Sequence, residues 1–139
     1  PATSDQIQRV EADTDAAIDT VLQSVPLEKA TRAVAVAGTA TTIAAAALGL
    51  KTYDSEAING SSISVDTVQK TAEMLRSMTR EERAALGYMH PGRVDVIGAG
   101  ATIYARIITR LHEITEGNID SVTVSEHDIL DGIALSQVR

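Results

Sequence analysis

Helical spacing of apolar residues organises the start of the chain. From Ile7 to Val25, the apolar residues fall at helical spacing on one face, and the acidic residues fall on the opposite face. Thr3, followed three residues later by Gln6, forms a capping box that marks the beginning of this helix. Because proline disfavours helical backbone at the preceding residue, Pro26 predicts that the helix ends near Val25.

The next pattern along the chain, RAVAVAGTATTIAAAALGL, predicts a strand, a turn and a helix. Residues Arg32 to Ala37 alternate valine with alanine without a charge after Arg32, which predicts a strand buried on both faces. Gly38 allows a tight turn, Thr39 caps the helix, and the alanine-rich stretch Thr41 to Leu48 forms its body. This unit is typical of an α/β domain, in which ligands bind at the carboxyl ends of the strands.

Weaker patterns predict a mostly helical remainder. We expect helices over residues 64–78, 79–87 and 94–115, short strands over 58–64 and 121–124, and a polar irregular segment over 51–59. Ser125 begins a last helix whose buried face is predicted to carry Ile129, Leu130, Ile133 and Ala134.

Composition narrows the functional classes. A chain of 139 residues suits one domain, and the absence of cysteine excludes disulfides and thiolate metal sites. The net charge of −7 and the lack of Phe and Trp argue against nucleic-acid and membrane-surface partners.

Residues Ala33 to Leu50 carry no charge, but they are only weakly apolar and contain a strand-to-helix break, so we reject a membrane span. With no signal peptide visible, we expect a cytoplasmic protein.

Charge is distributed unevenly along the chain. The segment from Arg76 to Arg110 contains six arginines and three acidic residues. The first nineteen residues, in contrast, contain five acidic residues and one arginine. Solvated helix faces account for most of these charges. An acidic protein with one basic region can still receive an anion locally.

The glycine turn after the first strand has two interpretations. In the first, Gly38 only lets the helix pack close to the strand, and the spacing alone favours that interpretation. In the second, exposed N–H groups at the helix start, together with the hydroxyls of Thr39 and Thr41, would meet phosphate oxygens.

A loop before the long helix offers a second candidate. Arg93 directly follows Pro91 and Gly92, and a planar guanidinium at this position could bind a phosphate. Arginine is slightly unfavourable at a helix N-terminus, so it should have a partner. From the residues alone, phosphate and carboxylate are equally good partners.

Three other patterns are weaker. Gly98 and Gly100 form a GxG that would suit a dinucleotide loop only if residues 94–97 were extended, and two glycines within a buried helix are favoured. Residues 125–128 contain serine, histidine and acids, but neighbours in sequence cannot converge on one atom, so they indicate a helix start. The three histidines show no metal-ligand spacing.

Taken together and in order, residues 38–45, 93–101 and 122–132 resemble the C-terminal half of the exopolyphosphatase / guanosine pentaphosphate phosphohydrolase family, in its actinobacterial form. The resemblance implies an α/β actin-like ATPase (ribonuclease H-like) fold, with a few-stranded mixed sheet packed with helices. Residues 1–139 would then be most of the second domain. The chain departs from the family at Leu130, where an arginine is expected before Asp131-Gly132.

The resemblance also implies which parts of the active site lie in this chain and which lie in the rest of the enzyme. Gly38, Thr39, Thr41 and Arg93 are the expected phosphate- and substrate-binding residues, with no catalytic residue and no metal ligand in this chain. The family's first domain and both phosphate loops are absent here. Mg²⁺ or another divalent metal, and polyphosphate or guanosine pentaphosphate as substrate, therefore belong to the full-length enzyme. We expect this chain alone to be inactive and to bind no metal.

A non-catalytic function is the alternative to the phosphohydrolase. Unpaired sheet edges invite association, so the chain could be a non-catalytic binding module or a homodimer.

Overall fold

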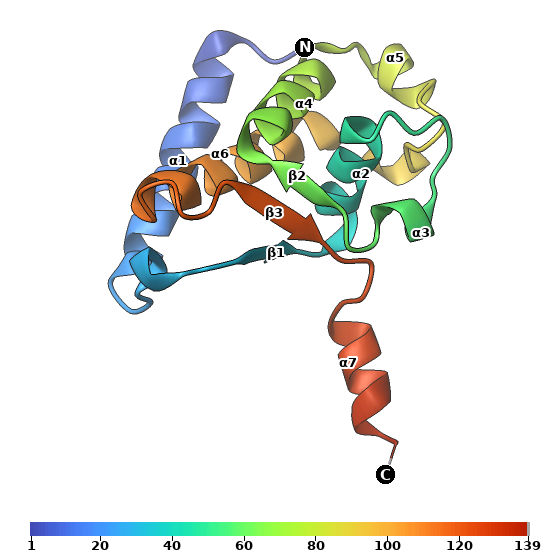
Figure 1. Ribbon diagram of the computed structural model, residues 1–139. Coiled ribbons are helices and arrows are strands. Elements are labelled where there is room, and N and C mark those ends of the chain that lie inside the picture. Colours follow the sequence, from blue (N-terminus) through green and yellow to red (C-terminus); the bar gives the residue numbers. More distant parts are fainter. Residues whose placement is uncertain (139) are drawn as a thin grey trace.

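The computed structural model describes residues 1–138 and has an α/β architecture built on one small sheet (Figure 1). Its strands are β1 (Ala33–Ala35), β2 (Ser62–Ser64) and β3 (Ser121–Val124), in the order β1-β3-β2. β1 runs parallel to β3, with Val34 opposite Thr123, and β2 runs antiparallel, with Ile63 opposite Val122. The sheet is therefore mixed, as predicted.

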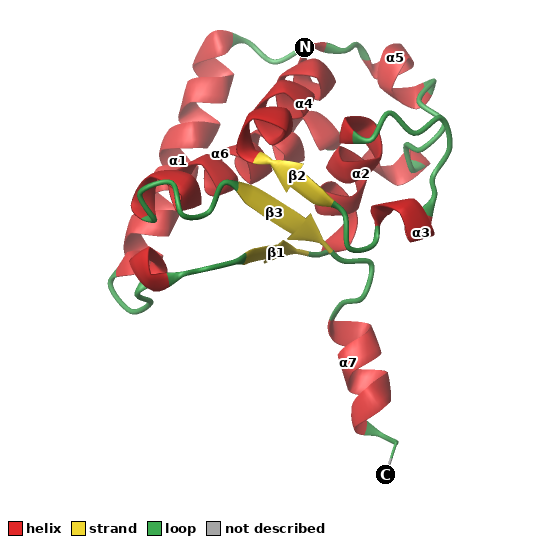
Figure 2. Cartoon of the chain, viewed as in Figure 1, coloured by secondary structure: helices red, strands yellow, loops and turns green. Residues whose placement is uncertain are grey.

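Helices make up most of the remaining structure (Figure 2). They are α1 (Ser4–Leu22), α2 (Ala37–Ala47), α3 (Ser55–Ile58), α4 (Val65–Ser77), α5 (Arg80–Ala84), α6 (Ile97–Ile114) and α7 (Ile129–Ser136), with single 3₁₀ turns at Leu27–Lys29 and Pro91–Arg93. α4 and α1 both pack against α6, and α2 packs against α4 and α6. Within the described residues, no helix has the length and apolar character needed to cross a bilayer.

The core lies between the sheet and helices α2, α4 and α6. Ile43 of α2, Leu75 of α4 and Ile97 of α6 are at most 1% exposed. Val122 and Val124 of β3 join them because alternate side chains of a strand point to the same face. Aliphatic residues make up most of this core, together with the buried side chains of Tyr88, Met89 and Thr42.

Several start signals are confirmed. Thr3 and Thr79 each form the predicted capping box, with Gln6 and Glu82, and Ser64 caps α4. β3 occupies the predicted residues, and β2 lies within the predicted range. α3 was missed in the segment expected to be irregular, where Asp54 caps it by accepting from two backbone N–H groups.

The first strand is shorter and more exposed than predicted. β1 covers three residues, and the side chains of Val34 and Val36 are 55% and 48% exposed. β1 is an edge strand, and the described helices cover one face of the sheet only, so the prediction of a strand buried on both faces is wrong.

The turn into α2 also differs from the prediction. Ala37, not Gly38, has the left-handed backbone, with φ of 71°. α2 begins at Ala37, so Thr39 lies inside the helix and does not cap it; Val36 is the N-cap and supplies no side-chain hydrogen bond.

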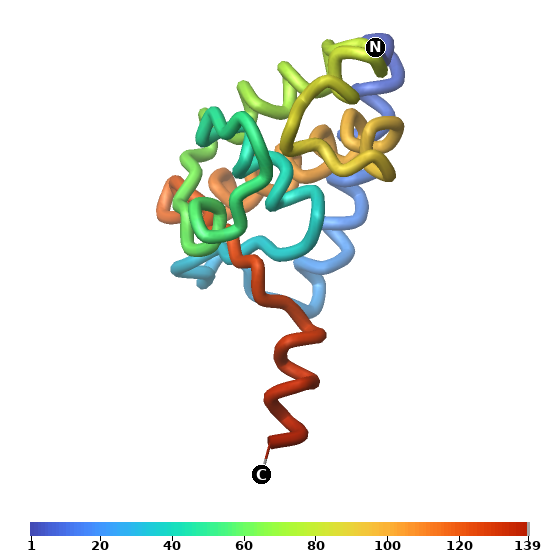
Figure 3. Tube along the Cα trace, turned by 90° about the vertical axis from the view of Figure 1, so that its right-hand side faces the viewer, coloured from blue at the N-terminus to red at the C-terminus, as the bar shows by residue number. Residues whose placement is uncertain are grey.

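The position of the last helix is predicted correctly, but the prediction that one of its faces is buried is wrong. Its cap is Asp128, which accepts from the Leu130 N–H at 2.9 Å, and not Ser125. Its apolar side chains are exposed: Ile129 76%, Leu130 71%, Ile133 54%; Ala134 is exposed as well. α7 extends away from the rest of the chain because the segment after β3 leads it off the sheet (Figures 1 and 3).

Candidate functional site

The first turn of α2 and Arg93 meet at a close contact. A Cβ added to Gly38 would overlap Nη2, Nε and Cζ of Arg93, so the guanidinium occupies the space that any other side chain would need. Gly38 and Arg93 are both half-buried. Gly38 is thus required for the approach of Arg93 and not for the turn.

Arg93 has no anionic partner in the described part of the chain. It ends the 3₁₀ turn Pro91–Arg93, which His90 caps by accepting from the Gly92 N–H at 3.1 Å. Within residues 1–138, no carboxylate lies within 4.0 Å of its guanidinium. The sequence left phosphate and carboxylate open as partners of Arg93, and the described residues do not supply the carboxylate.

The start of α2 adds donors beside this guanidinium. Val36 offers no side-chain acceptor, and the first turn contains no acidic residue. The backbone N–H groups of that turn are the ones that an α-helix leaves without intrahelical partners, and they lie at the positive end of the helix dipole. Together with Arg93, they form a surface suited to an anion.

Ala37 joins β1 to this helix in a strained backbone conformation. A non-glycine residue with φ of 71° costs about 1–2 kcal/mol. Such strain is retained where the surrounding structure fixes it, and it is common at ligand-binding turns.

The two threonines play unequal parts. Thr39 is half-buried, and its Oγ1 lies 3.1 Å from the position a Cβ would take on Gly100, so it packs at the junction of α2 and α6. Thr41 is 4% exposed, and its hydroxyl donates to the Gly38 carbonyl at 3.4 Å. A role for Thr41 in binding substrate stays a prediction. Its burial and its bond to Gly38 favour a role in fixing the first turn of α2.

Tyr53 connects this region to the segment after β3. Its hydroxyl donates to the Glu126 carboxylate at 2.5 Å. Burial, followed by this hydrogen bond, raises the pKa of Tyr53, and the nearby Thr41 hydroxyl and Arg93 charge partly offset the rise. Neither Tyr53 nor Glu126 was predicted, since no local pattern links residues so far apart.

A cavity of about 340 Å³ opens beside Arg93. It is lined by Tyr53, Gly87, Tyr88, Met89, His90 and Arg93. Gly87 permits the walls to come together, because a Cβ there would overlap the Lys51 carbonyl oxygen. Arg93 therefore borders an opening through which a ligand could approach it.

Comparison with known proteins agrees with this architecture. A family model described as the Ppx/GppA phosphatase family matches residues 2–137. The chain belongs to the Ppx/GppA family. It is 47% identical over 119 residues to Exopolyphosphatase 2 of two Mycobacterium tuberculosis strains, CDC 1551 / Oshkosh and H37Rv, covering 86% of this chain. The chain spans 37% of the length of these curated relatives.

Solved structures of Ppx/GppA proteins share the fold. The crystal structure of an exopolyphosphatase-like protein matches 96% of this chain and 42% of its own length, with a TM-score of 0.92 and 39% identity. The PPX-GPPA enzyme of Aquifex aeolicus matches 97% of this chain and 42% of its own, with a TM-score of 0.79 and 24% identity. The fold is accordingly actin-like, as predicted.

The dinucleotide alternative for this Ppx/GppA chain is excluded. It required residues 94–97 to be extended, but residues 94–96 form a turn and α6 begins at Ile97. Gly98 and Gly100 lie within α6, where they allow the close approach of Arg83 and Thr39.

The residues of this site do not fit a divalent metal. Mg²⁺ prefers oxygen ligands, mainly carboxylates and water. Here the ligand-facing groups are a guanidinium and backbone N–H groups, and Glu126 approaches only through its bond to Tyr53. Residues 1–138 contain no group of three or more His, Asp or Glu side chains that could hold a metal ion. The site can bind an anion, and we derive no metal-dependent step from it.

Proposed function

We propose that this chain forms the anion-binding wall of a phosphohydrolase that removes terminal phosphate from inorganic polyphosphate. Membership of the Ppx/GppA family supports the hydrolase class, and the name of the mycobacterial relatives supports polyphosphate. The observation that carries the proposal is the guanidinium of Arg93 lying on Gly38 at the start of α2, with no carboxylate within 4.0 Å among residues 1–138.

The proposed role of these residues is to bind and orient. Arg93 would donate to phosphate oxygens through its planar guanidinium, and the first N–H groups of α2 would donate to the same or a neighbouring phosphate. Both sets of donors are fixed before the substrate arrives, so they stabilise negative charge without reorganisation. The attacking water, and Mg²⁺ or another divalent ion, would be held by residues outside this chain.

The test is the substitution Arg93→Gln in the intact protein. We expect kcat/KM for polyphosphate to fall about ten- to a hundredfold, because charge-assisted hydrogen bonds of about 1.5–3 kcal/mol are lost. The matched control is Arg80→Gln, which removes an equal charge from an exposed side chain paired with Asp95 at 2.8 Å. Equal losses for the two variants would overturn the assigned role of Arg93.

Guanosine pentaphosphate is the second substrate that the proposal includes. Its phosphates would meet the same donors, so comparing kcat/KM for the two substrates in the intact protein determines which is preferred. A cytoplasmic location stays a prediction, based on the absence of cysteine and of a visible signal peptide in the sequence.

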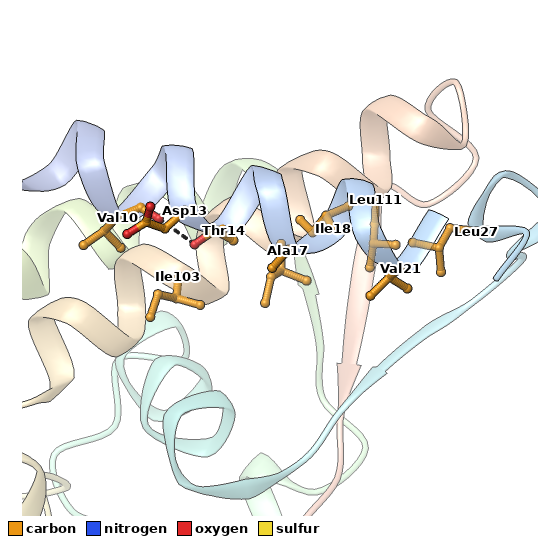
Figure 4. Close-up of a pocket in the computed structure, with 10 residues that line it drawn as sticks. Val10, Asp13, Thr14, Ala17, Ile18, Val21, Leu27, Ile103 and Leu111 are labelled. Carbon is orange, nitrogen blue, oxygen red and sulfur yellow. Dashed lines mark hydrogen bonds between the residues drawn. The ribbon is translucent and has the colours of Figure 1, made fainter. Parts of the chain in front are cut away.

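The exposed apolar surface supports a second candidate function, the pairing of two copies. The apolar side chains of α7 extend into solvent, and β1 leaves one edge of the sheet unpaired within the described residues. A cavity of about 620 Å³ between α1 and α6, lined almost wholly by aliphatic side chains such as Ala17, Ile18 and Ile103, could receive α7 of a partner (Figure 4).

Light scattering tests this pairing directly. We expect a dimer whose fraction rises with concentration, and a monomer for the double variant Leu130→Glu and Ile133→Glu. The control Gln137→Glu adds a charge near the same helix and should leave the dimer intact. A strict monomer at all concentrations would remove the candidate.

A further inference from the structure

A second charged cavity lies beside the first turn of α6. It measures about 450 Å³ and is enclosed by the first turns of α1, the end of α4, α5 and the first turn of α6. Its walls carry three guanidinium groups, those of Arg9, Arg76 and Arg83. None of the residues proposed to bind substrate lines this cavity, so it is a separate site, and only its use by a polyphosphate chain held at Arg93 rests on the proposed function.

Positive charge in this cavity is not neutralised by the described residues. Asp95 is the carboxylate on its wall, and it already accepts from Arg80 Nε at 2.8 Å. Arg9, Arg76 and Arg83 form no ion pair within residues 1–138. Glu11 and Glu73 lie with Arg76 on a neighbouring cavity, but neither comes within 4.0 Å of its guanidinium.

Arg83 is fixed in place by neutral groups. Its guanidinium donates to the carbonyls of Leu75 at 3.0 Å, Met78 at 3.0 Å and Val94 at 3.2 Å. Carbonyl oxygens hold the side chain rigidly but leave its full charge in place. Two of its five N–H groups have no acceptor in these bonds and remain able to bind a ligand.

The contact with α6 resembles the one at the first site. A Cβ added to Gly98 would lie 3.3 Å from Nη2 of Arg83, so the guanidinium again rests on a glycine in the first turn of a helix. Gln6 adds neutral donors, since its side-chain oxygen is taken by the Thr3 N–H and its amide group belongs to the same cavity wall.

We propose that this cavity is a second binding site, specific for phosphate-class oligoanions. Three guanidinium groups converging from three helices suit a ligand with several oxygens and more than one negative charge. Two sources of such a ligand are a distal part of a polyphosphate chain held at Arg93, and a separate small oligophosphate.

The test uses tripolyphosphate as the probe and amide NMR shifts of the intact protein as the readout. We expect saturable shifts of the Gly98 and Ala99 amides, and a loss of affinity of at least about tenfold in the double variant Arg9→Gln and Arg76→Gln. Those two side chains hold no backbone carbonyl, so their removal leaves the Arg83 contacts and the fold in place. Arg32→Gln, at an exposed arginine near β1, is the control for general electrostatics.

Two further measurements separate the outcomes. Arg93→Gln should leave the Gly98 shifts unchanged, so failure of the first site and failure of this one are distinguishable. Long-chain polyphosphate that spans both sites would lose affinity in either variant, whereas a separate oligophosphate would respond only to its own arginines. Unshifted Gly98 and Ala99 amides, or equal losses in Arg32→Gln and the double variant, would overturn the proposal.

Discussion

Two glycines in the first turns of helices each lie beneath an arginine guanidinium. Gly38 of α2 supports Arg93, and Gly98 of α6 supports Arg83. Neither glycine has the positive φ that usually explains a glycine, since the left-handed residue at the start of α2 is Ala37. These positions require the absence of a Cβ, which lets a cation approach the helix backbone.

The substitution Gly38→Ala should weaken phosphate binding without lowering the stability of the fold. Its Cβ would displace the guanidinium of Arg93, a flexible side chain, so the fold can accommodate it. Alanine in a helix is favoured over glycine by up to about 1 kcal/mol. We expect unchanged or higher stability in urea unfolding, together with weaker phosphate binding by calorimetry in the intact protein.

A matched control for this prediction lies in α7. Gly132 has no heavy atom within 4 Å of its added Cβ, so Gly132→Ala should give the same gain in helix propensity and leave phosphate binding unchanged. Phosphate affinity that survives Gly38→Ala intact would contradict the placement of Arg93.

At the scale of elements, the uneven charge of the sequence joins α1 to α6. Asp15 accepts from Arg106 Nε at 2.7 Å and Nη2 at 2.6 Å, and Asp19 accepts from Arg110 at 2.9 Å. The acidic first helix thus neutralises the later part of the arginine-rich segment. Among residues 1–138, the arginines of this segment that have no carboxylate within 4.0 Å are Arg76, Arg83 and Arg93, near the two proposed anion sites.

The Asp15–Arg106 pair gives a prediction with a defined pH dependence. The hydrogen bond from Arg106 holds the pKa of Asp15 below its ordinary value, so the pair stabilises the fold above the unfolded pKa of about 3.9. This stabilisation is lost as pH falls through the lower, folded pKa. In a double-mutant cycle with Asp15→Asn and Arg106→Gln, we expect a coupling of about 1 kcal/mol at pH 7.

Urea unfolding at a series of pH values measures this coupling. It should stay constant from neutral pH down to about 5 and diminish below about 4. The exposed pair Lys70–Asp66 on α4, at 2.7 Å, is the control and should show a smaller coupling. A coupling that increases as the carboxylate becomes protonated would refute the assignment.

Local signals in the sequence predicted where elements begin, and long-range packing determined the features that the sequence could not predict. The capping boxes at Thr3 and Thr79 act within four residues, so they can be seen in the sequence. The exposure of Val34 and Ile129 depends on the groups that lie across the sheet and beyond β3, which apolar patterning does not report. For the same reason, the loop sequence makes Arg93 a candidate, but it cannot predict the contact of its guanidinium with Gly38.

At the scale of the whole molecule, the described chain has one covered and one open face. Helices α2, α4 and α6 pack on one side of the sheet (Figure 1). The side chains of Val34 and Val36 and the apolar side chains of α7 are exposed to solvent. The chain also spans only 37% of the length of its curated relatives. Cationic donors are gathered on it without any cluster of metal-binding side chains in residues 1–138.

This distribution of groups predicts that the 139-residue chain does not hydrolyse polyphosphate by itself. Arg93 and the start of α2 are proposed to bind a phosphate, but hydrolysis also requires a positioned water and a means of stabilising the leaving group. Phosphate release from polyphosphate should therefore stay at the background rate with Mg²⁺ present, while circular dichroism should show a folded, cooperatively melting chain. The intact protein, assayed in parallel, should release phosphate and lose that activity with a chelator. Chelator-sensitive release by the 139-residue chain would mean that it holds a complete active site, and the assignment of Arg93 to a binding role alone would have to be abandoned.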